Sequence, residues 1–207
     1  MTLMDRRRAL MAEKKESGRI PSAYREVEWV GFNLGAYLST GIVPIDNPRV
    51  VTSVKVTDTA GTRRGLWSFG SSGAPGYRIL NYYTSSNNVA TIYGSNSSYA
   101  MPTPELRQTE NWVTIDFSNV LKINGTKKKT YTRESFSENT KQIIIGKSHD
   151  YNGNYRFQTI KIYDGDDLKS ELVPCYRKSD NKIGAYCLVR NIFLEGTGTL
   201  TKGADVT

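Results

Sequence analysis

Short runs of alternating apolar and polar residues dominate the chain from Val27 onward, and Gly, Asn, Ser or Pro bounds each run. Such alternation puts successive side chains on opposite faces of a β-strand. Residues 50–56 show it most clearly, because the even positions are Val, Thr, Val and Val while Ser53 and Lys55 lie between them. The pattern predicts an all-β protein of roughly a dozen antiparallel strands. Further strands are predicted at residues 65–69, 77–83, 89–93, 112–117, 120–123, 142–146, 157–163 and 168–173.

Two connections between these runs have the composition of tight turns. Asn124-Gly125 follows the run 120–123, and both residues tolerate the positive φ of a two-residue hairpin. Residues 127–129 are three lysines directly after this hairpin tip, and their charges would protect an edge strand from pairing with a neighbour. Residues 164–167 join the last two predicted strands into a second hairpin.

The N-terminal residues 2–16 are the exception to the β-pattern. They are good helix formers without Gly or Pro, Thr2 is a possible N-cap, and Ser17-Gly18 is a stop signal. A helix of this length is marginal in water and needs a partner surface, which could be its own sandwich, a second copy or another protein. The alternative is a frayed basic arm. The apolar stripe predicted to serve attachment or oligomerisation consists of Leu3, Met4, Leu10 and Met11.

Composition fits one β-domain at residues 21–207 behind an arm at 1–20. All-β domains reach about 200 to 250 residues, and at this size a core forms without a disulfide or metal. Cys175 and Cys187 are too few for a disulfide framework and lack zinc spacing, so we interpret them as buried thiols. A bridge between them stays open, since it depends on a Cα separation below about 7 Å.

Charge and hydropathy argue against several classes of protein, namely nucleic-acid-binding, secreted and membrane proteins. The chain has 28 Lys and Arg against 20 Asp and Glu, a net charge of +8 that favours polyanions weakly. Its basic residues form small clusters that match no nucleic-acid-binding motif. Neither a leader-type apolar run nor a stretch of about 20 apolar residues is present, so we expect a protein made and kept in the cytoplasm, without a membrane partner.

Candidate catalytic groups are sparse. Hydrolysis of a glycosidic bond needs two carboxyl groups about 5 to 10 Å apart, and alternate acids on one strand supply them in sandwich hydrolases. Glu26 and Glu28 have this spacing but no third acid follows, whereas Asp164 and Asp166 occupy a Gly-containing turn that favours Asp by itself. His149 is the single histidine, and neither cysteine has a base nearby in sequence. The sequence predicts no enzyme, with a glycoside hydrolase as the least favoured option.

The loop at residues 149–155 is the best candidate for ligand contact. Asp150, Asn152 and Asn154 match the first three oxygen positions of a calcium loop, but Tyr155 and Lys161 stand where a Gly and an acid are needed. We therefore predict neither a metal nor another cofactor; calcium is not supported. Aromatic rings and amides do suit a carbohydrate. The predicted glycan-binding residues are Tyr151, Asn152, Asn154 and Tyr155, with a second patch at Tyr82 and Tyr83; simple packing between core and surface is the alternative.

A family resemblance covers about residues 22–203. Residues 160–164 (IKIYD), 172–184 (LVPCYRKSDNKIG) and 196–203 (GTGTLTKG) are its main motifs, together with 24–30 (YREVEWV) and 37–44 (YLSTGIVP). They resemble the laminin-G-like, concanavalin A-like domains of phage or prophage structural proteins and bacterial surface proteins. Relatives carry acids where Cys187 and Ser39 stand here, which puts an ion site in doubt.

The resemblance implies a two-sheet antiparallel jelly-roll sandwich. It also implies a non-catalytic phage or prophage virion protein, such as a fibre, decoration or tail component, assembled in the host cytoplasm. Its lectin-like domain would bind cell-surface polysaccharide, and its partners would be other virion proteins or further copies joined through the N-terminal helix. The alternative is a carbohydrate-binding module at a bacterial cell surface.

Overall fold

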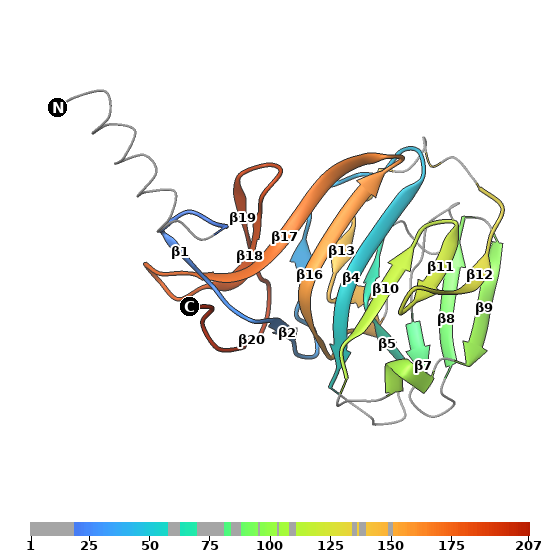
Figure 1. Ribbon diagram of the computed structural model, residues 1–207, viewed down its shortest axis with the longest axis horizontal. Coiled ribbons are helices and arrows are strands. Elements are labelled where there is room, and N and C mark those ends of the chain that lie inside the picture. The colour runs from blue at the N-terminus through green and yellow to red at the C-terminus, as the bar shows by residue number, and fades with distance from the viewer. Residues whose placement is uncertain are drawn as a thin grey trace.

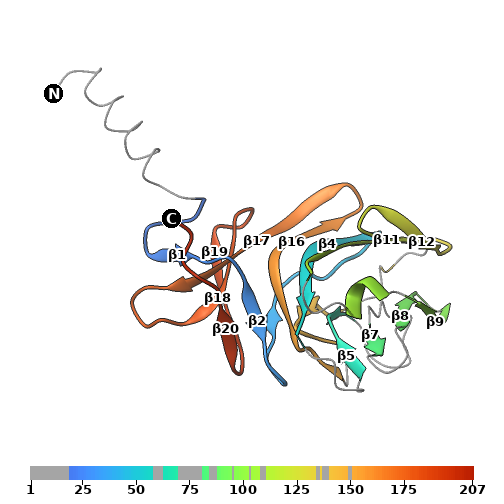
Figure 2. The same ribbon diagram turned by 60° about the horizontal axis from the view of Figure 1, so that its bottom comes forward.

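The protein is built from antiparallel strands in two layers (Figures 1 and 2). The computed structural model describes residues 19–57, 63–69, 81–83, 88–94, 96–102, 104–107, 111–133, 136, 140–148 and 151–207. One layer is an 11-stranded sheet with the main order β12-β11-β10-β4-β16-β17-β18-β19. Its strands are β1 (Tyr24–Glu26), β2 (Val30–Phe32), β4 (Pro48–Val56), β10 (Val113–Phe117), β11 (Val120–Ile123), β12 (Thr126–Thr130), β16 (Tyr155–Asp164), β17 (Asp167–Arg177), β18 (Ile183–Cys187), β19 (Ile192–Glu195) and β20 (Leu200–Lys202).

The other layer consists of three smaller antiparallel sheets. In Figure 2, β5, β7, β8 and β9 lie below β4, β16 and β11. A 3₁₀ turn, η1 (Pro104–Arg107), follows the last strand of the four-stranded sheet. The strands are β3 (Leu38–Ser39), β13 (Ile144–Ile145) and β6 (Trp67–Ser68); β14 (Lys147–Ser148) and β15 (Tyr151–Asn152); and β5 (Arg63–Gly65), β7 (Asn81–Tyr83), β8 (Asn88–Tyr93) and β9 (Asn96–Pro102).

The alternation read from the sequence decides which faces are buried. Along β4, every even-numbered residue is buried and every odd-numbered one is half-buried. Neighbouring β10 pairs with β4 so that Val113 lies opposite Val54 and Phe117 opposite Val50. All four side chains belong to the same core, as the sequence predicted. The all-β prediction is therefore confirmed for the described residues, which contain antiparallel ladders and one 3₁₀ turn.

Aromatic side chains fill the space between the layers. Tyr93 of β8 meets Phe117 of β10 edge-on, with ring centroids 6.4 Å apart, and stacks on Tyr131 at 5.6 Å. Phe136 meets both Tyr93 and Phe69 nearly at right angles. Edge-to-face and offset contacts of this kind are the favoured aromatic geometries and add to the energy of burial.

The predicted hairpin after β11 is confirmed. Asn124 has φ 48° and Gly125 φ 76°, the two positive values of a type I′ turn. Strand β12 is the last strand of the large sheet on this side, and the exposed Lys127 lies on it. The lysines thus occupy an edge strand, where charge opposes sheet-to-sheet association.

The two thiols are buried on opposite faces of the large sheet. Cys187 packs in the main core, whereas Cys175 packs in a second apolar cluster on the outer face. Neither forms a disulfide, which confirms the interpretation as buried thiols. The difference follows from the register of the two strands. Cys187 of β18 lies opposite Leu172 of β17, and Cys175 lies three residues after Leu172 on β17. An odd separation puts two residues of a strand on opposite faces.

Thiol labelling should separate the two cysteines. Burial raises the pKa of Cys175 to about 12, so its thiolate is scarce at pH 8. Burial also opposes ionisation of Cys187, but hydrogen bonds from Ser170 and Arg190 outweigh it and lower the pKa of that thiol. We expect iodoacetamide at pH 8 to label neither thiol quickly in the folded protein, Cys187 before Cys175 on partial unfolding, and both in urea. Rapid labelling of folded Cys175, measured by peptide mass, would contradict this assignment.

The predicted N-terminal helix, with Leu3, Met4, Leu10 and Met11, lies outside the described residues, so its role stays a prediction. Arg19 and Ile20, which begin the described chain, already contact the sheet. Arg19 pairs with Glu26 of β1, and Ile20 is buried in the outer-face cluster with Cys175. Within the described part of the chain, no helix has the length and apolar character needed to cross a membrane.

Candidate functional site

The prediction that Tyr155 contacts a sugar is wrong, because its ring is in the core. Tyr155 begins β16, is 1% exposed, and packs against Phe32 with ring centroids 5.1 Å apart. Its hydroxyl donates to the carbonyl oxygen of Leu66 at 2.6 Å and accepts the N–H of Gly146 at 3.1 Å. The predicted strand began at Phe157. Because β16 begins two residues earlier, Tyr155 and Phe157 are alternate residues of one strand, and both side chains point into the core.

The rest of the predicted loop is not brought together into a site by the described contacts. The side-chain oxygen of Asn154 accepts a hydrogen bond from the Thr57 hydroxyl at 3.0 Å, so this amide is held at the end of β4. Asn152 is exposed on β15. The backbone of Tyr151 is on β15, and the backbones of Tyr82 and Tyr83 are on β7. The side chains of these three tyrosines lie outside the described part, as do His149 and Asp150, so their glycan contact stays a prediction.

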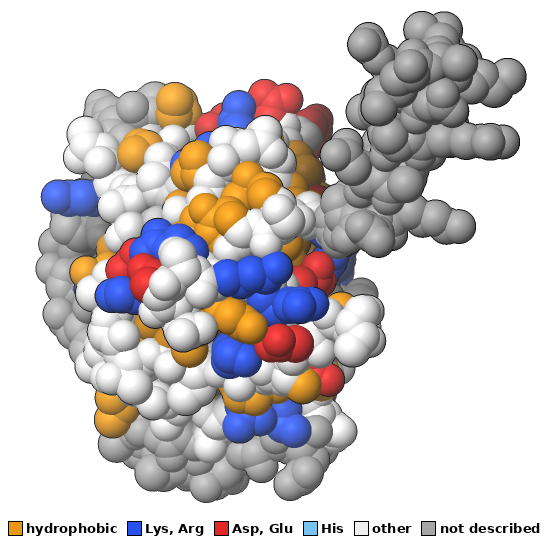
Figure 3. All heavy atoms as spheres, turned by 90° about the vertical axis from the view of Figure 1, so that its left-hand side faces the viewer, with side chains coloured by type: hydrophobic (Ala, Val, Ile, Leu, Met, Phe, Trp, Pro, Cys, Tyr) orange, Lys and Arg blue, Asp and Glu red, His pale blue; other side chains and the backbone are white. Residues whose placement is uncertain are grey.

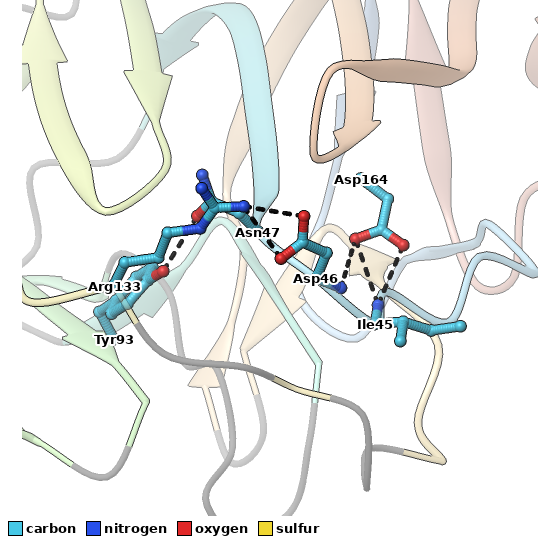
Figure 4. A network of polar contacts seen from close by, with 6 residues as sticks. All are labelled: Ile45, Asp46, Asn47, Tyr93, Arg133 and Asp164. Atoms are coloured by element: carbon cyan, nitrogen blue, oxygen red, sulfur yellow. Dashed lines mark hydrogen bonds and ion pairs between the residues drawn. The ribbon is translucent and has the colours of Figure 1, made fainter.

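Two of the four acids considered as catalytic groups, Asp164 and Glu26, have structural partners, and Figure 4 shows those of Asp164. Asp164 accepts the backbone N–H groups of Ile45 at 3.0 Å and Asp46 at 2.9 Å, and thereby ties the β16–β17 turn to the segment before β4. Asp46 in turn pairs with Arg133 at 2.8 Å. Glu26 pairs with Arg19. Across the described ranges, no group of three or more His, Cys, Asp or Glu side chains is placed to hold a metal ion.

A second cluster, at the end of the large sheet that carries β1, β18 and β19, is largely self-satisfied. Tyr24 stacks on Phe193 at 5.1 Å and packs against Tyr186 at 5.1 Å. Arg177 lies over Phe193 and bonds Asp180, which holds the pKa of that carboxyl below its usual range. The space-filling view of this end shows hydrophobic side chains among paired basic and acidic ones (Figure 3). The charged groups Arg177, Asp180 and Glu195 are therefore already paired with one another.

A different surface, on the outer face of the large sheet, has two cations without an acidic partner among the described residues. In the ladder, Arg156 of β16 lies opposite Gly31 of β2 on one side and Lys55 of β4 on the other. Gly31 is also opposite Thr201 of β20. Because the neighbours Tyr155 and Phe157 face the core, Arg156 points away from it. Four strands thus place these residues in one row.

Two glycines allow a tryptophan to lie against this row. A Cβ on Gly31 would be 3.3 Å from Cζ3 of Trp29, and one on Gly203 would be 2.6 Å from its Nε1. Without those atoms the indole lies close to the backbone. The Arg156 guanidinium carbon then lies 3.9 Å from the centroid of the Trp29 ring. This cation–π contact fixes the plane of the guanidinium and leaves its N–H edges to other partners.

Uncharged polar groups border the stack. The Ser53 hydroxyl donates to the Gln158 side-chain oxygen at 3.2 Å. The register of β16 against β4 shifts between Phe157 and Thr159, which makes Gln158 the extra residue of a β-bulge. Bulges redirect side chains and are frequent beside functional sites. We define the Arg156 patch as Trp29, Ser53, Lys55, Arg156, Gln158 and Thr201.

Charge distinguishes this patch from the remainder of the face. Within the described residues, neither Arg156 nor Lys55 has an acidic partner or a hydrogen bond. Other cations of the same face are compensated: Arg49 pairs with Asp116 at 2.7 Å, and Lys161 pairs with Glu171 at 3.4 Å. Like charges directly opposite on neighbouring strands are destabilising. Alternation in residues 50–56 predicts that Lys55 points outward, but nothing local in the sequence places it beside Arg156.

Comparisons with known proteins add little to this geometry. No protein-family model matches the chain, and no curated protein matches it. Among solved structures, it is similar to a candidate carbohydrate binding protein from Bacteroides ovatus, with 11% identity and a TM-score of 0.49. The likeness covers 88% of this chain, which spans 62% of that protein. A similarity of this size assigns neither a fold nor a ligand, so the class defined here is that of two-layer antiparallel β-proteins.

Proposed function

We propose that the chain is a non-catalytic glycan-binding module of the concanavalin A-like jelly-roll type, and that the Arg156 patch contacts the sugar. The observation that carries the proposal is the stack of Arg156 on Trp29 beside a row of hydroxyl and amide groups. Sugars offer hydroxyls to such polar groups and apolar C–H faces to planar ones. Ser53, Gln158 and Thr201 supply the former, and the stack supplies the latter.

The composition of the patch disfavours hydrolysis. Glycoside cleavage uses a pair of carboxyl groups on either side of the scissile bond. The six residues of the patch include two cations and no acid. A sugar held there would meet no proton donor or nucleophile of that kind.

A role in a phage virion, with attachment through residues 1–20, and a role at a bacterial surface both remain predictions from the resemblance. Each would employ a sugar-binding module, so the proposal does not depend on choosing between them. Polysaccharide binding by the full chain is the property that both share.

Replacing Trp29 by alanine tests the patch directly. The full chain would be screened on an array of neutral and acidic bacterial polysaccharides, and a hit would be titrated by calorimetry. We expect Trp29→Ala to weaken binding about tenfold, because a cation–π contact of one to two kcal/mol no longer holds Arg156. Tyr163→Ala is the matched control, since Tyr163 lies under the acid-paired Arg49 on the same face at 5.3 Å.

Two results would contradict the proposal. One is the absence of binding to every polysaccharide of the array by the unaltered protein. The other is equal weakening by Trp29→Ala and Tyr163→Ala, which would trace the loss to general disturbance of the sheet.

A further inference from the structure

We propose that the ligand of the Arg156 patch carries a carboxylate and is a polysaccharide containing uronic acid. This inference rests on the proposed glycan binding and adds the chemical class of the sugar. It starts from the two cations that the fold places side by side. Arg156 and Lys55 are directly opposite in the β16–β4 ladder and both point outward.

Among the residues that the structure describes, none provides an anion for this pair. The neighbours on the same face are Gly31, Ser53, Gln158 and Thr201, all of them uncharged. In the described part of the chain, no carboxylate lies within ion-pair distance of either cation. A bound carboxylate would relieve the repulsion between them, whereas a neutral sugar would leave it in place.

The geometry of the arginine favours a planar anion. Stacking on Trp29 at 3.9 Å orients the guanidinium, whose N–H fork matches the two oxygens of a carboxylate. Lys55 adds a second positive charge beside that position. The hydroxyl and amide groups of Ser53, Gln158 and Thr201 then face the part of the ligand that bears sugar hydroxyls.

Nucleic acid fits the same surface poorly. Binding of a polynucleotide depends on cations that neutralise several successive phosphates. On this face, the neighbouring cations Arg49, Lys122 and Lys161 are already paired with Asp116 or Glu171. Two uncompensated charges match a single carboxylate better than a phosphate backbone.

A pair of matched polymers separates the carboxylate from the sugar. The full chain would be titrated with polygalacturonate and with the same polymer after chemical reduction of its carboxyl groups. We expect tighter binding to the acidic form. Arg156→Gln should weaken that binding at least about tenfold, since hydrogen bonds between charged groups contribute more than neutral ones. Lys55→Gln should weaken it less, and in both variants binding of the acidic polymer should fall by a larger factor than binding of the reduced polymer.

Lys161→Gln is the charge-matched control, because it removes one positive charge from the same strand and face but from an existing ion pair. We expect it to leave affinity unchanged. Equal weakening by Lys161→Gln and Arg156→Gln would overturn the inference in favour of non-specific attraction. Thermal melts should show that all three variants remain folded.

The remaining outcomes distinguish this inference from the proposed function. Equal affinity for the acidic and reduced polymers would overturn the inference that the ligand carries a carboxylate, and would leave the proposed glycan binding intact. Failure to bind polygalacturonate, alginate and hyaluronate, with binding to neutral polysaccharides retained, would do the same. Tighter, Arg156-dependent binding of dextran sulfate or DNA would replace the carboxylate with a sulfate or phosphate. No binding to any polysaccharide would remove both proposals.

Discussion

Replacing Tyr155 by alanine is expected to lower the free energy of unfolding by about 3 to 5 kcal/mol, the range for removing a large aromatic side chain from a core. The ring is 1% exposed and packs against Phe32. It also connects the layers, because its hydroxyl bonds Leu66 and Gly146 while its backbone lies in the large sheet. Loss of the side chain would both leave a cavity in the core and remove this connection between the layers.

Tyr155→Phe separates the two contributions. It keeps the ring and removes the hydroxyl, so we expect a loss of about 1 kcal/mol. Urea unfolding followed by tryptophan fluorescence would measure both variants. A near-normal midpoint for Tyr155→Ala would show that the ring is outside the core, as the glycan-contact prediction required.

Gly184→Ala is expected to destabilise the protein by about 2 to 3 kcal/mol through overpacking. Gly184 of β18 lies opposite Glu195 of β19. An added Cβ would overlap the carbonyl oxygen of Leu194 and lie 2.9 Å from Cζ of Phe193. Because one of these atoms is backbone, a rotamer change cannot relieve the clash, and β19 must move away.

Gly125→Ala is the control for this substitution. Nothing lies within 4 Å of a Cβ at Gly125, although its φ of 76° disfavours alanine. We expect a cost of about 1 kcal/mol there, without loss of strand pairing. Hydrogen exchange should show faster exchange across β18 and β19 in Gly184→Ala alone. Similar exchange in both variants would mean that β19 is not packed as described.

The two glycines differ in how far the local sequence predicts their surroundings. The Asn124-Gly125 turn was predictable because positive φ at two successive residues is a property of those residues. The crowding at Gly184 was not, since the atoms that crowd it belong to the next strand. Tyr155 shows the same limit: one strand boundary misplaced by two residues turned a core side chain into a presumed ligand contact.

The candidate site shows this limit most clearly. Lys55, Arg156 and Thr201 come from three strands and Trp29 directly precedes a fourth, β2, and each is unremarkable in its own segment. Lys55 was expected to point outward, but its proximity to Arg156 depends on the pairing of β4 with β16. No spacing rule within the chain encodes that pairing, because 100 residues and several strands separate the two segments.

Alternation, turn residues and composition were sufficient for the antiparallel β-class, for the inward faces of β4 and β10, and for the hairpin after β11. These features depend on the period of a strand and on backbone preferences, which neighbouring residues specify. The face carrying each thiol, the burial of Tyr155 and the row of cations beside Trp29 required the folded chain. They depend on which strands become neighbours and in what register, and that is settled by packing between distant segments.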